Sequence, residues 1–136
     1  MAENEHMHEN GEVHQGEHHD QAAPVTPMTG DAKDVEENKM IAALGYVWVL
    51  ALVPFLAKKD SKFAQFHAKQ GMVLFIVEVI SAIIGYIPIV GLIWIPFGLI
   101  LGLVLLVFSI MGIINAYQGQ MKELPVVGSL AKQLFK

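Results

Sequence analysis

Residues 72–117 decide the fold: MVLFIVEVISAIIGYIPIVGLIWIPFGLILGLVLLVFSIMGIINAY, 46 residues in which Glu78 is the only side chain charged at neutral pH. As one α-helix this stretch would be about 70 Å long, more than twice the roughly 30 Å of bilayer hydrocarbon. Three helix-interrupting residues lie near its middle: Pro88, Gly91 and Pro96. We therefore expect two membrane spans, over residues 72–87 and 97–117.

A shorter apolar run, residues 40–57, precedes this stretch and ends at Lys58 and Lys59. Its 18 residues are just long enough to cross a bilayer. After it, Asp60 or Ser61 can cap a helix that enters the second span. The sequence thus predicts an all-α integral membrane protein with three transmembrane helices. Near the C-terminus, an interfacial amphipathic helix is predicted by apolar residues at helical spacing: Val127, Leu130 and Leu134.

The N-terminal residues 1–38 have a different composition, because ten of the thirteen acidic residues lie there and few are apolar. Such a segment buries too little apolar surface to offset the entropy of ordering, so we predict a disordered tail before a membrane domain over residues 39–136. The tail carries weak candidate metal ligands: His6, His8, His14, His18 and His19. Because no ligand spacing is fixed, we expect no built metal site and no cofactor.

Composition narrows the function classes. The chain has no arginine, which argues against nucleic-acid binding, and no cysteine, which excludes disulfides and thiol catalysis. No nucleophile–base pair, phosphate loop or zinc-protease helix is recognisable, so we expect no enzyme. The acidic first residues do not resemble a signal peptide. The expected partners are the lipid bilayer and either other membrane proteins or further copies of the chain.

Lysine positions predict the orientation, because the lysine-rich side of short loops is cytoplasmic. With three spans, Lys33 and Lys39 fall on one side of the membrane. The other seven lysines fall on the opposite side: Lys58, Lys59, Lys62, Lys69, Lys122, Lys132 and Lys136. We therefore expect a multi-pass protein of the cell membrane with its N-terminus outside and its C-terminus in the cytoplasm.

Glu78 is the most distinctive residue of the spans. A charge in the centre of a membrane helix costs about 2.5–3.5 kcal/mol on insertion scales, so such residues usually face protein or water. Small or polar residues share its helix face: Gly71, Ser81, Ala82 and Gly85. The simplest reading is a protonated carboxyl that bonds to another helix, and an ion or proton role is the alternative.

Two further features bear on helix packing. Trp48 lies near the middle of the first predicted span, where its indole N–H either bonds Glu78 or simply packs among helices. The third span carries a G-x-x-x-G pair, Gly98 and Gly102, followed by Gly112. Small residues four apart let helices approach closely, either within the monomer or between copies.

Several segments resemble the Tic-twenty-like family, which includes a chloroplast inner-envelope import component and small bacterial membrane proteins. They are residues 38–40, 59–71 (KDSKFAQFHAKQG), 115–119 (NAYQG) and 124–128 (LPVVG). The resemblance implies that His67, Gln70 and Asn115 are functional residues gathered at the inner membrane surface. Alternatively, they satisfy one another's hydrogen bonds where two helices enter the interface.

These observations together favour a small membrane protein of that type with a non-catalytic structural or interaction role. The alternative is an oligomeric channel or a protein-translocation component. Three short spans with one carboxylate cannot line a pore without oligomerising, so the two readings differ in the oligomeric state they require.

Overall fold

The computed structural model describes residues 28, 29 and 31–136 of the chain. In this part the elements follow one another as β1 (Met28–Thr29), α1 (Ala32–Leu44), the 3₁₀ helix η1 (Trp48–Ala51), α2 (Leu52–Ala57), α3 (Lys62–Gly85), α4 (Val90–Tyr117), β2 (Gln120–Met121) and α5 (Val127–Leu134). Helices therefore make up nearly all of the described part, as the sequence predicts.

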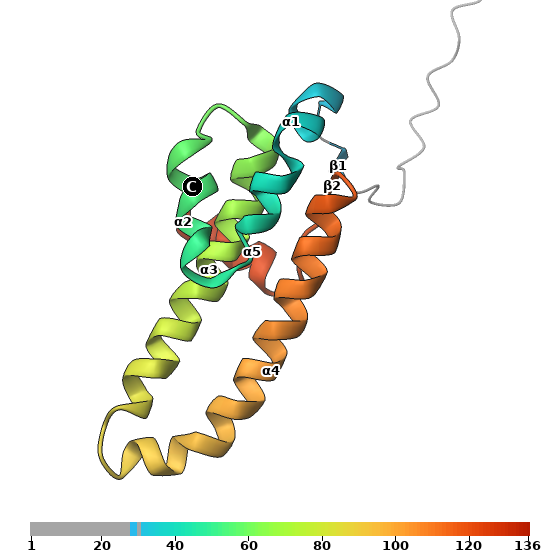
Figure 1. Cartoon of the computed structure of the whole chain (residues 1–136). Helices are drawn as coiled ribbons and strands as arrows, with labels where there is room; N and C mark the ends of the chain where they lie inside the picture. Colours follow the sequence, from blue (N-terminus) through green and yellow to red (C-terminus); the bar gives the residue numbers. More distant parts are fainter. Residues whose placement is uncertain (1–27, 30) are drawn as a thin grey trace, which may run out of the picture.

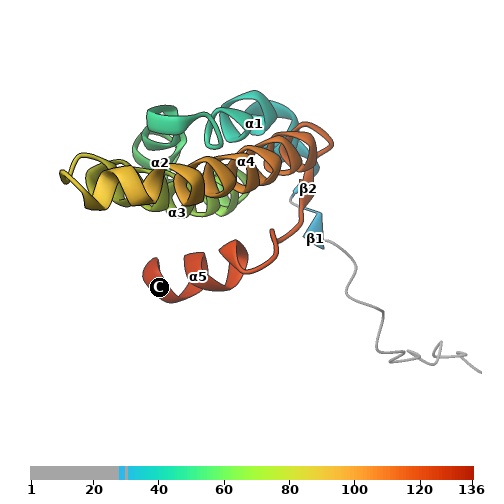
Figure 2. The same cartoon turned by 90° about the horizontal axis from the view of Figure 1, so that it is seen from below.

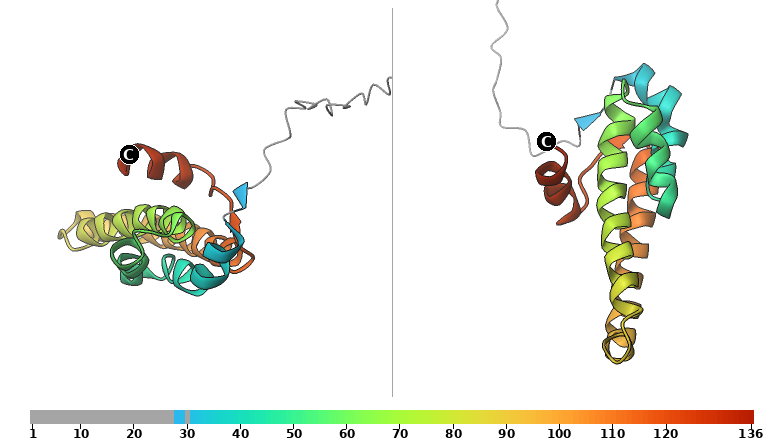
Figure 3. Two further views of the ribbon diagram at one scale, coloured as in Figure 1. Left: turned by 90° about the horizontal axis from the view of Figure 1, so that it is seen from above. Right: turned by 90° about the vertical axis from the view of Figure 1, so that its left-hand side faces the viewer.

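The helices form three layers at one end of the molecule. α3 and α4 make a long hairpin in the middle layer, and α1 with α2 covers one face of its upper half (Figure 1). α5 lies against the opposite face, as the views from below and from the side show (Figures 2 and 3). The lower half of the hairpin projects from this assembly with no other element beside it, so the core is confined to one end.

The first predicted span, residues 40–57, is not a span. α1 ends at Leu44, the chain turns through Gly45–Val47, and η1 and α2 run back toward the end from which α1 came. The turn is possible because Gly45 packs against the backbone of α3, where a side chain would not fit. Residues 40–57 are long enough to cross a bilayer, but they fold instead as a helical hairpin that is packed on one face against α3 and α4.

Two helices are long and apolar enough to cross a membrane, α3 and α4. In the core helix of a soluble protein most of the apolar stretch is buried, but here only 28% of the α3 stretch and 6% of the α4 stretch is buried. Bare apolar surface of this extent fits lipid rather than water. The described chain therefore has two candidate membrane-spanning helices and not three.

The two helices also extend beyond the predicted spans. Ser61 caps α3, and its hydroxyl accepts a hydrogen bond from the Ala64 N–H at 2.9 Å. The helix is broken only around Pro88 and Ile89, where Ile89 has a positive φ of 71°. The sequence predicts that Pro96 interrupts the helix. Instead, Pro96 lies inside α4, whose first turns run across the tip of the hairpin (Figure 1).

Both ends of the described chain lie at the same end of the hairpin. β1 pairs with β2 in antiparallel register, Met28 opposite Met121 and Thr29 opposite Gln120. This pairing is incompatible with the expectation that the N-terminal segment and the C-terminal helix lie on opposite sides of a membrane. In addition, residues 32–38, expected to be disordered, form the first half of α1. The rest of the predicted tail lies outside the described residues, except for β1.

Candidate functional site

A buried polar junction joins α1, α3 and α4 at the covered end of the hairpin. The His67 side chain is fully buried, and its Nδ1 lies 2.9 Å from the Tyr46 hydroxyl. The Tyr46 ring in turn lies against Gly112 of α4, in the space that a Cβ would occupy. The other ring nitrogen of His67, Nε2, is also buried. Tyr46 and His67 therefore tie the turn after α1 to the long hairpin.

Gln70 connects the same junction to the C-terminal segment. Its Oε1 accepts a hydrogen bond from the Leu124 N–H at 2.7 Å, while its Nε2 is buried without a partner. Asn115, the third residue of the expected polar cluster, is also buried, on α4. Within residues 31–136, however, no hydrogen bond joins any two of His67, Gln70 and Asn115. The three lie at one end of the hairpin, but each is held by a different part of the fold.

The backbones of two helices come into direct contact at Gly71. A Cβ built on Gly71 would overlap the carbonyl oxygen of Gly45, so α1 and α3 meet backbone to backbone. At Gly102 a Cβ would meet nothing within 4 Å, and the same is true at Gly85. At Gly98 the nearest atoms are those of the Trp94 ring, at 3.3 Å. Among the described residues, the G-x-x-x-G pair therefore makes no backbone-to-backbone contact of the kind seen at Gly71, and the nearest α3 atom to a Cβ on Gly98 is the Ser81 Oγ at 3.9 Å.

Glu78 is exposed on the bare part of α3. It lines a groove of about 760 Å³ between the hairpin and the turn after α1, together with Trp48, Gly98, Gly102 and Ser109. Trp48 is 62% exposed and has a positive φ of 44°, which a bulky residue rarely adopts. Although Trp48 and Glu78 line one groove, no hydrogen bond joins these two described residues. That the Glu78 carboxyl bonds to another helix stays a prediction.

Ser81 has a partner that sequence reasoning did not identify. Its hydroxyl accepts a hydrogen bond from Trp94 Nε1 at 3.0 Å, which joins α3 to α4 near the tip of the hairpin. Both residues line a smaller hollow that also contains Glu78, Gly98 and Gly102. The polar residues of the two spans thus gather along one side of the hairpin.

Two further contacts were not anticipated. Asp34 of α1 accepts hydrogen bonds from the Phe63 N–H at 3.0 Å and from Asn38 Nδ2 at 2.9 Å, so its carboxylate lies at the N-terminus of α3. Tyr46 was read only as part of an apolar span. Its position directly after Gly45 was the available signal, because a glycine commonly ends a helix. The histidine tail lies outside the described residues, and the described residues contain no cluster of metal-ligating side chains.

The geometry defines a class of protein: a small helical membrane protein with a two-helix hairpin, a buried polar junction at one end and a carboxylate in an apolar groove. Residues 37–131 match the MamF/MmsF family, described as a magnetosome magnetite crystal formation protein family, and the chain belongs to this family. The resemblance to the Tic-twenty-like family is therefore wrong. No solved structure matches the chain.

Individual relatives support this assignment. The chain is 35% identical over 95 residues to the magnetosome protein MmsF of Paramagnetospirillum magneticum, which covers 70% of this chain and 86% of that protein. It is 34% identical over 89 residues to the magnetosome protein MamF of the same organism, covering 65% and 78%. A UPF0132 membrane protein of Methanocaldococcus jannaschii is 31% identical over 103 residues, covering 74% and 71%. The family thus includes proteins named for magnetosomes and proteins named only for the membrane.

Proposed function

We propose that this protein is a non-catalytic membrane component that works by binding other membrane proteins, in the first place a second copy of itself, through the Glu78 groove. The observation that carries the proposal is the exposure of Glu78 on an otherwise apolar hairpin. Lipid tails offer no hydrogen bond to a carboxyl group, and a charge there costs about 2.5–3.5 kcal/mol. A helix that brings a polar group into the groove removes this cost.

Gly102 supports the same reading. Glycine in a helix costs about 1 kcal/mol relative to alanine in water, and no contact inside the monomer makes glycine necessary at this position. Gly98 and Gly102 lie beside Glu78 in the groove, where small residues let a neighbouring helix approach closely. Glu78 and the two glycines therefore lie on the same face of the hairpin, which is the face proposed to bind a second copy.

The orientation that fits this fold has both described ends in the cytoplasm. All nine lysines lie in the covered end of the hairpin or in the segments beside it, between Lys33 and Lys69 or between Lys122 and Lys136. The tip of the hairpin, residues 86–96, has no charged residue. By the positive-inside rule the covered end is cytoplasmic and the tip faces the opposite side.

The relatives suggest where the protein acts. We infer that in a host that makes magnetosomes it works in the magnetosome membrane and influences the formation of the magnetite crystal. The tip carries no carboxylate or imidazole with which to bind iron. This supports an effect that passes through neighbouring membrane proteins rather than through direct contact with the mineral.

A single substitution tests the association. Gly102→Leu fills the groove without disturbing a contact inside the monomer, so it should reduce the oligomer to a monomer in mild detergent and leave the melting temperature unchanged. Val104→Leu is the matched control, because Val104 is exposed on α4 but does not line the Glu78 groove. A Gly102→Leu protein with the mass of the parent would contradict the proposal.

The magnetosome role needs a cellular test. The full chain and its Gly102→Leu variant should be expressed in a Paramagnetospirillum strain that lacks MmsF, and the sizes of the magnetite crystals measured by electron microscopy. We expect the parent chain to restore crystal size at least in part, and the variant to restore less at equal abundance. Crystals that the parent leaves unchanged, despite its presence in the magnetosome fraction, would count against this role.

A further inference from the structure

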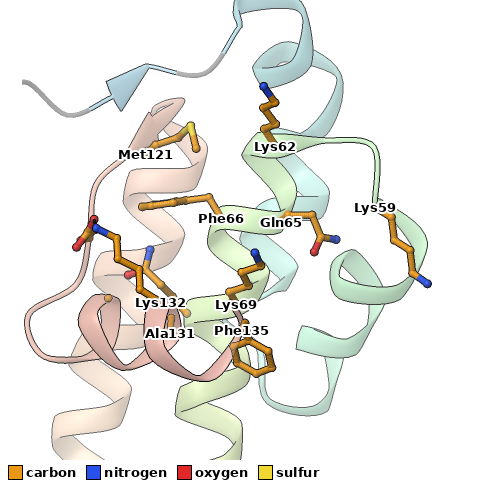
Figure 4. Close-up of a pocket in the computed structure, with 12 residues that line it drawn as sticks. Lys59, Lys62, Gln65, Phe66, Lys69, Met121, Ala131, Lys132 and Phe135 are labelled. Carbon is orange, nitrogen blue, oxygen red and sulfur yellow. Dashed lines mark ion pairs between the residues drawn. The ribbon is translucent and has the colours of Figure 1, made fainter.

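A second groove, unconnected with Glu78, lies between α3 and α5 at the covered end of the hairpin. It has a volume of about 530 Å³ and is lined by side chains of both helices and of β2 (Figure 4). Two contacts hold α5 beside the groove. Gln70 of α3 accepts a hydrogen bond from the Leu124 N–H, and Phe135 packs edge to face on Phe55, with ring centroids 5.3 Å apart. The groove is therefore a fixed feature of the fold.

The charge of this groove is strongly positive. Four lysines line it, Lys59, Lys62, Lys69 and Lys132, against the single carboxylate of Glu123. Glu123 is already paired with Lys132. The other three lysines, Lys59, Lys62 and Lys69, therefore have no acidic partner among the residues that line the groove. An anionic ligand would supply the missing counter-charge.

The rest of the lining is suited to a ligand that is also apolar. Phe66, Met121 and Phe135 give the groove apolar walls, with Lys62 toward one end and Lys69 and Phe135 toward the other (Figure 4). Gln70 lines the groove as well; it is only 1% exposed, and its Nε2 has no hydrogen-bond partner within the described part of the chain. An unpaired buried N–H costs about 1–3 kcal/mol, so an acceptor oxygen at this position is favoured.

The position along α3 identifies the source of such a ligand. Lys62 and Lys69 precede Met72, where the apolar part of the helix begins. The groove therefore lies at the level of the lipid headgroups when the hairpin spans a bilayer. We propose that it binds one anionic phospholipid, whose headgroup phosphate contacts the lysines and whose acyl chain lies along Phe66 and Phe135.

Native mass spectrometry of the full chain in detergent tests this site, with dioleoylphosphatidylglycerol titrated against dioleoylphosphatidylcholine. The triple variant Lys62→Gln/Lys69→Gln/Lys132→Gln should bind the first phosphatidylglycerol about 10-fold or more weakly than the parent. Lys33→Gln/Lys39→Gln/Lys122→Gln removes the same charge from the same end but outside the groove, and it should weaken binding less than about 3-fold. Phosphatidylcholine should bind weakly to all three proteins.

Three results would overturn the proposal: equal weakening in both triple variants, equal binding of phosphatidylcholine, or displacement of phosphatidylglycerol by inorganic phosphate at the same concentration. The first would indicate diffuse surface charge, and the last a site for a free anion. If the glutamine variant does not fold, the corresponding arginine variant keeps the charge and must bind phosphatidylglycerol like the parent. Loss of binding in a folded arginine variant also contradicts the site.

Discussion

The contact between α1 and α3 at Gly71 makes a quantitative prediction. A Cβ at this position would overlap the Gly45 carbonyl oxygen, and real Cβ contacts shorter than 3.0 Å are essentially never seen. The obstacle is backbone rather than a flexible side chain, so Gly71→Ala can be accommodated only if α1 moves away from α3. Overpacking of this kind costs about 1–3 kcal/mol, and a rigid neighbour places the cost near the upper end.

Alanine also favours the helix over glycine by about 1 kcal/mol, which offsets part of that cost. The net loss in the free energy of unfolding should therefore be about 2 kcal/mol. The matched control is Gly102→Ala, which gains the same propensity and meets no atom within 4 Å. This control should be as stable as the parent or slightly more stable.

The measurement is unfolding by sodium dodecyl sulfate in mixed micelles, followed by circular dichroism and by tryptophan fluorescence. Trp48 lies directly after the turn that Gly71 holds in place, so the fluorescence change should come earlier in the titration for Gly71→Ala. If Gly71→Ala and Gly102→Ala unfold at the same detergent fraction, α1 does not pack on α3 as described.

Three further predictions concern polar contacts. Tyr46→Phe removes the hydroxyl that lies 2.9 Å from Nδ1 of the buried His67, so it should lower the unfolding free energy by about 1–3 kcal/mol, whereas Tyr117→Phe, at a 61% exposed position, should not. Burial opposes ionisation of Asp34, but hydrogen bonds from Ser61, the Phe63 N–H and Asn38, together with the charge of Lys58, outweigh it and lower the pKa of this carboxyl. The stabilisation by Asp34 is therefore complete above the unfolded pKa of about 3.9 and is lost as the pH falls through the lower folded pKa. Asp34→Asn should flatten this part of the curve of stability against pH by less than about 1 kcal/mol. An unchanged curve would contradict the reasoning. Trp94→Phe removes the interhelical bond to Ser81 and should cost about 0.6 kcal/mol in the same unfolding assay, with no effect expected in a Ser81→Ala background.

Much of the fold follows from the sequence because hydrophobic length is a strong constraint in a bilayer. The 46-residue apolar stretch has to cross, turn and cross again, and α3 and α4 do form such a hairpin. The amphipathic spacing of Val127 and its neighbours likewise corresponds to α5. Ser61, one of two residues expected to cap α3, is its N-cap.

The first predicted span shows the limit of hydropathy. Residues 40–57 are buried against protein on one face only, at Ala42, Ala51 and Pro54, while large apolar side chains such as Trp48 and Leu56 are exposed. Whether an apolar run of this length spans the membrane or turns back depends on the contact between Gly45 and Gly71. These two residues are 26 positions apart, so no local sequence pattern reveals the contact. The predicted side of the N-terminal segment depends on this count, because two spans rather than three place both described ends on one side of the membrane.

The candidate site was predictable as a list of residues but not as an arrangement. Glu78, Gly98 and Gly102 stand out in the sequence, and they do line the same hollow. That Glu78 is exposed, and that a Cβ on Gly102 would meet no described atom within 4 Å, depend on how α3 and α4 pack in three dimensions. Similarly, His67 is conspicuous in the sequence, but its partner Tyr46 comes from a turn that was read as part of a helix.

Cysteine crosslinking in native membranes tests association through the Glu78 groove most directly, because the chain contains no cysteine of its own. Leu106→Cys places a thiol in the groove, and Ile100→Cys places one at a similarly exposed position of α4 that does not line it, with exposed fractions of 55% and 63% for the native side chains. Under mild oxidation we predict a disulfide-linked dimer for Leu106→Cys and little or none for Ile100→Cys. Equal crosslinking of the two variants, or crosslinking of Ile100→Cys alone, would contradict the proposed interface.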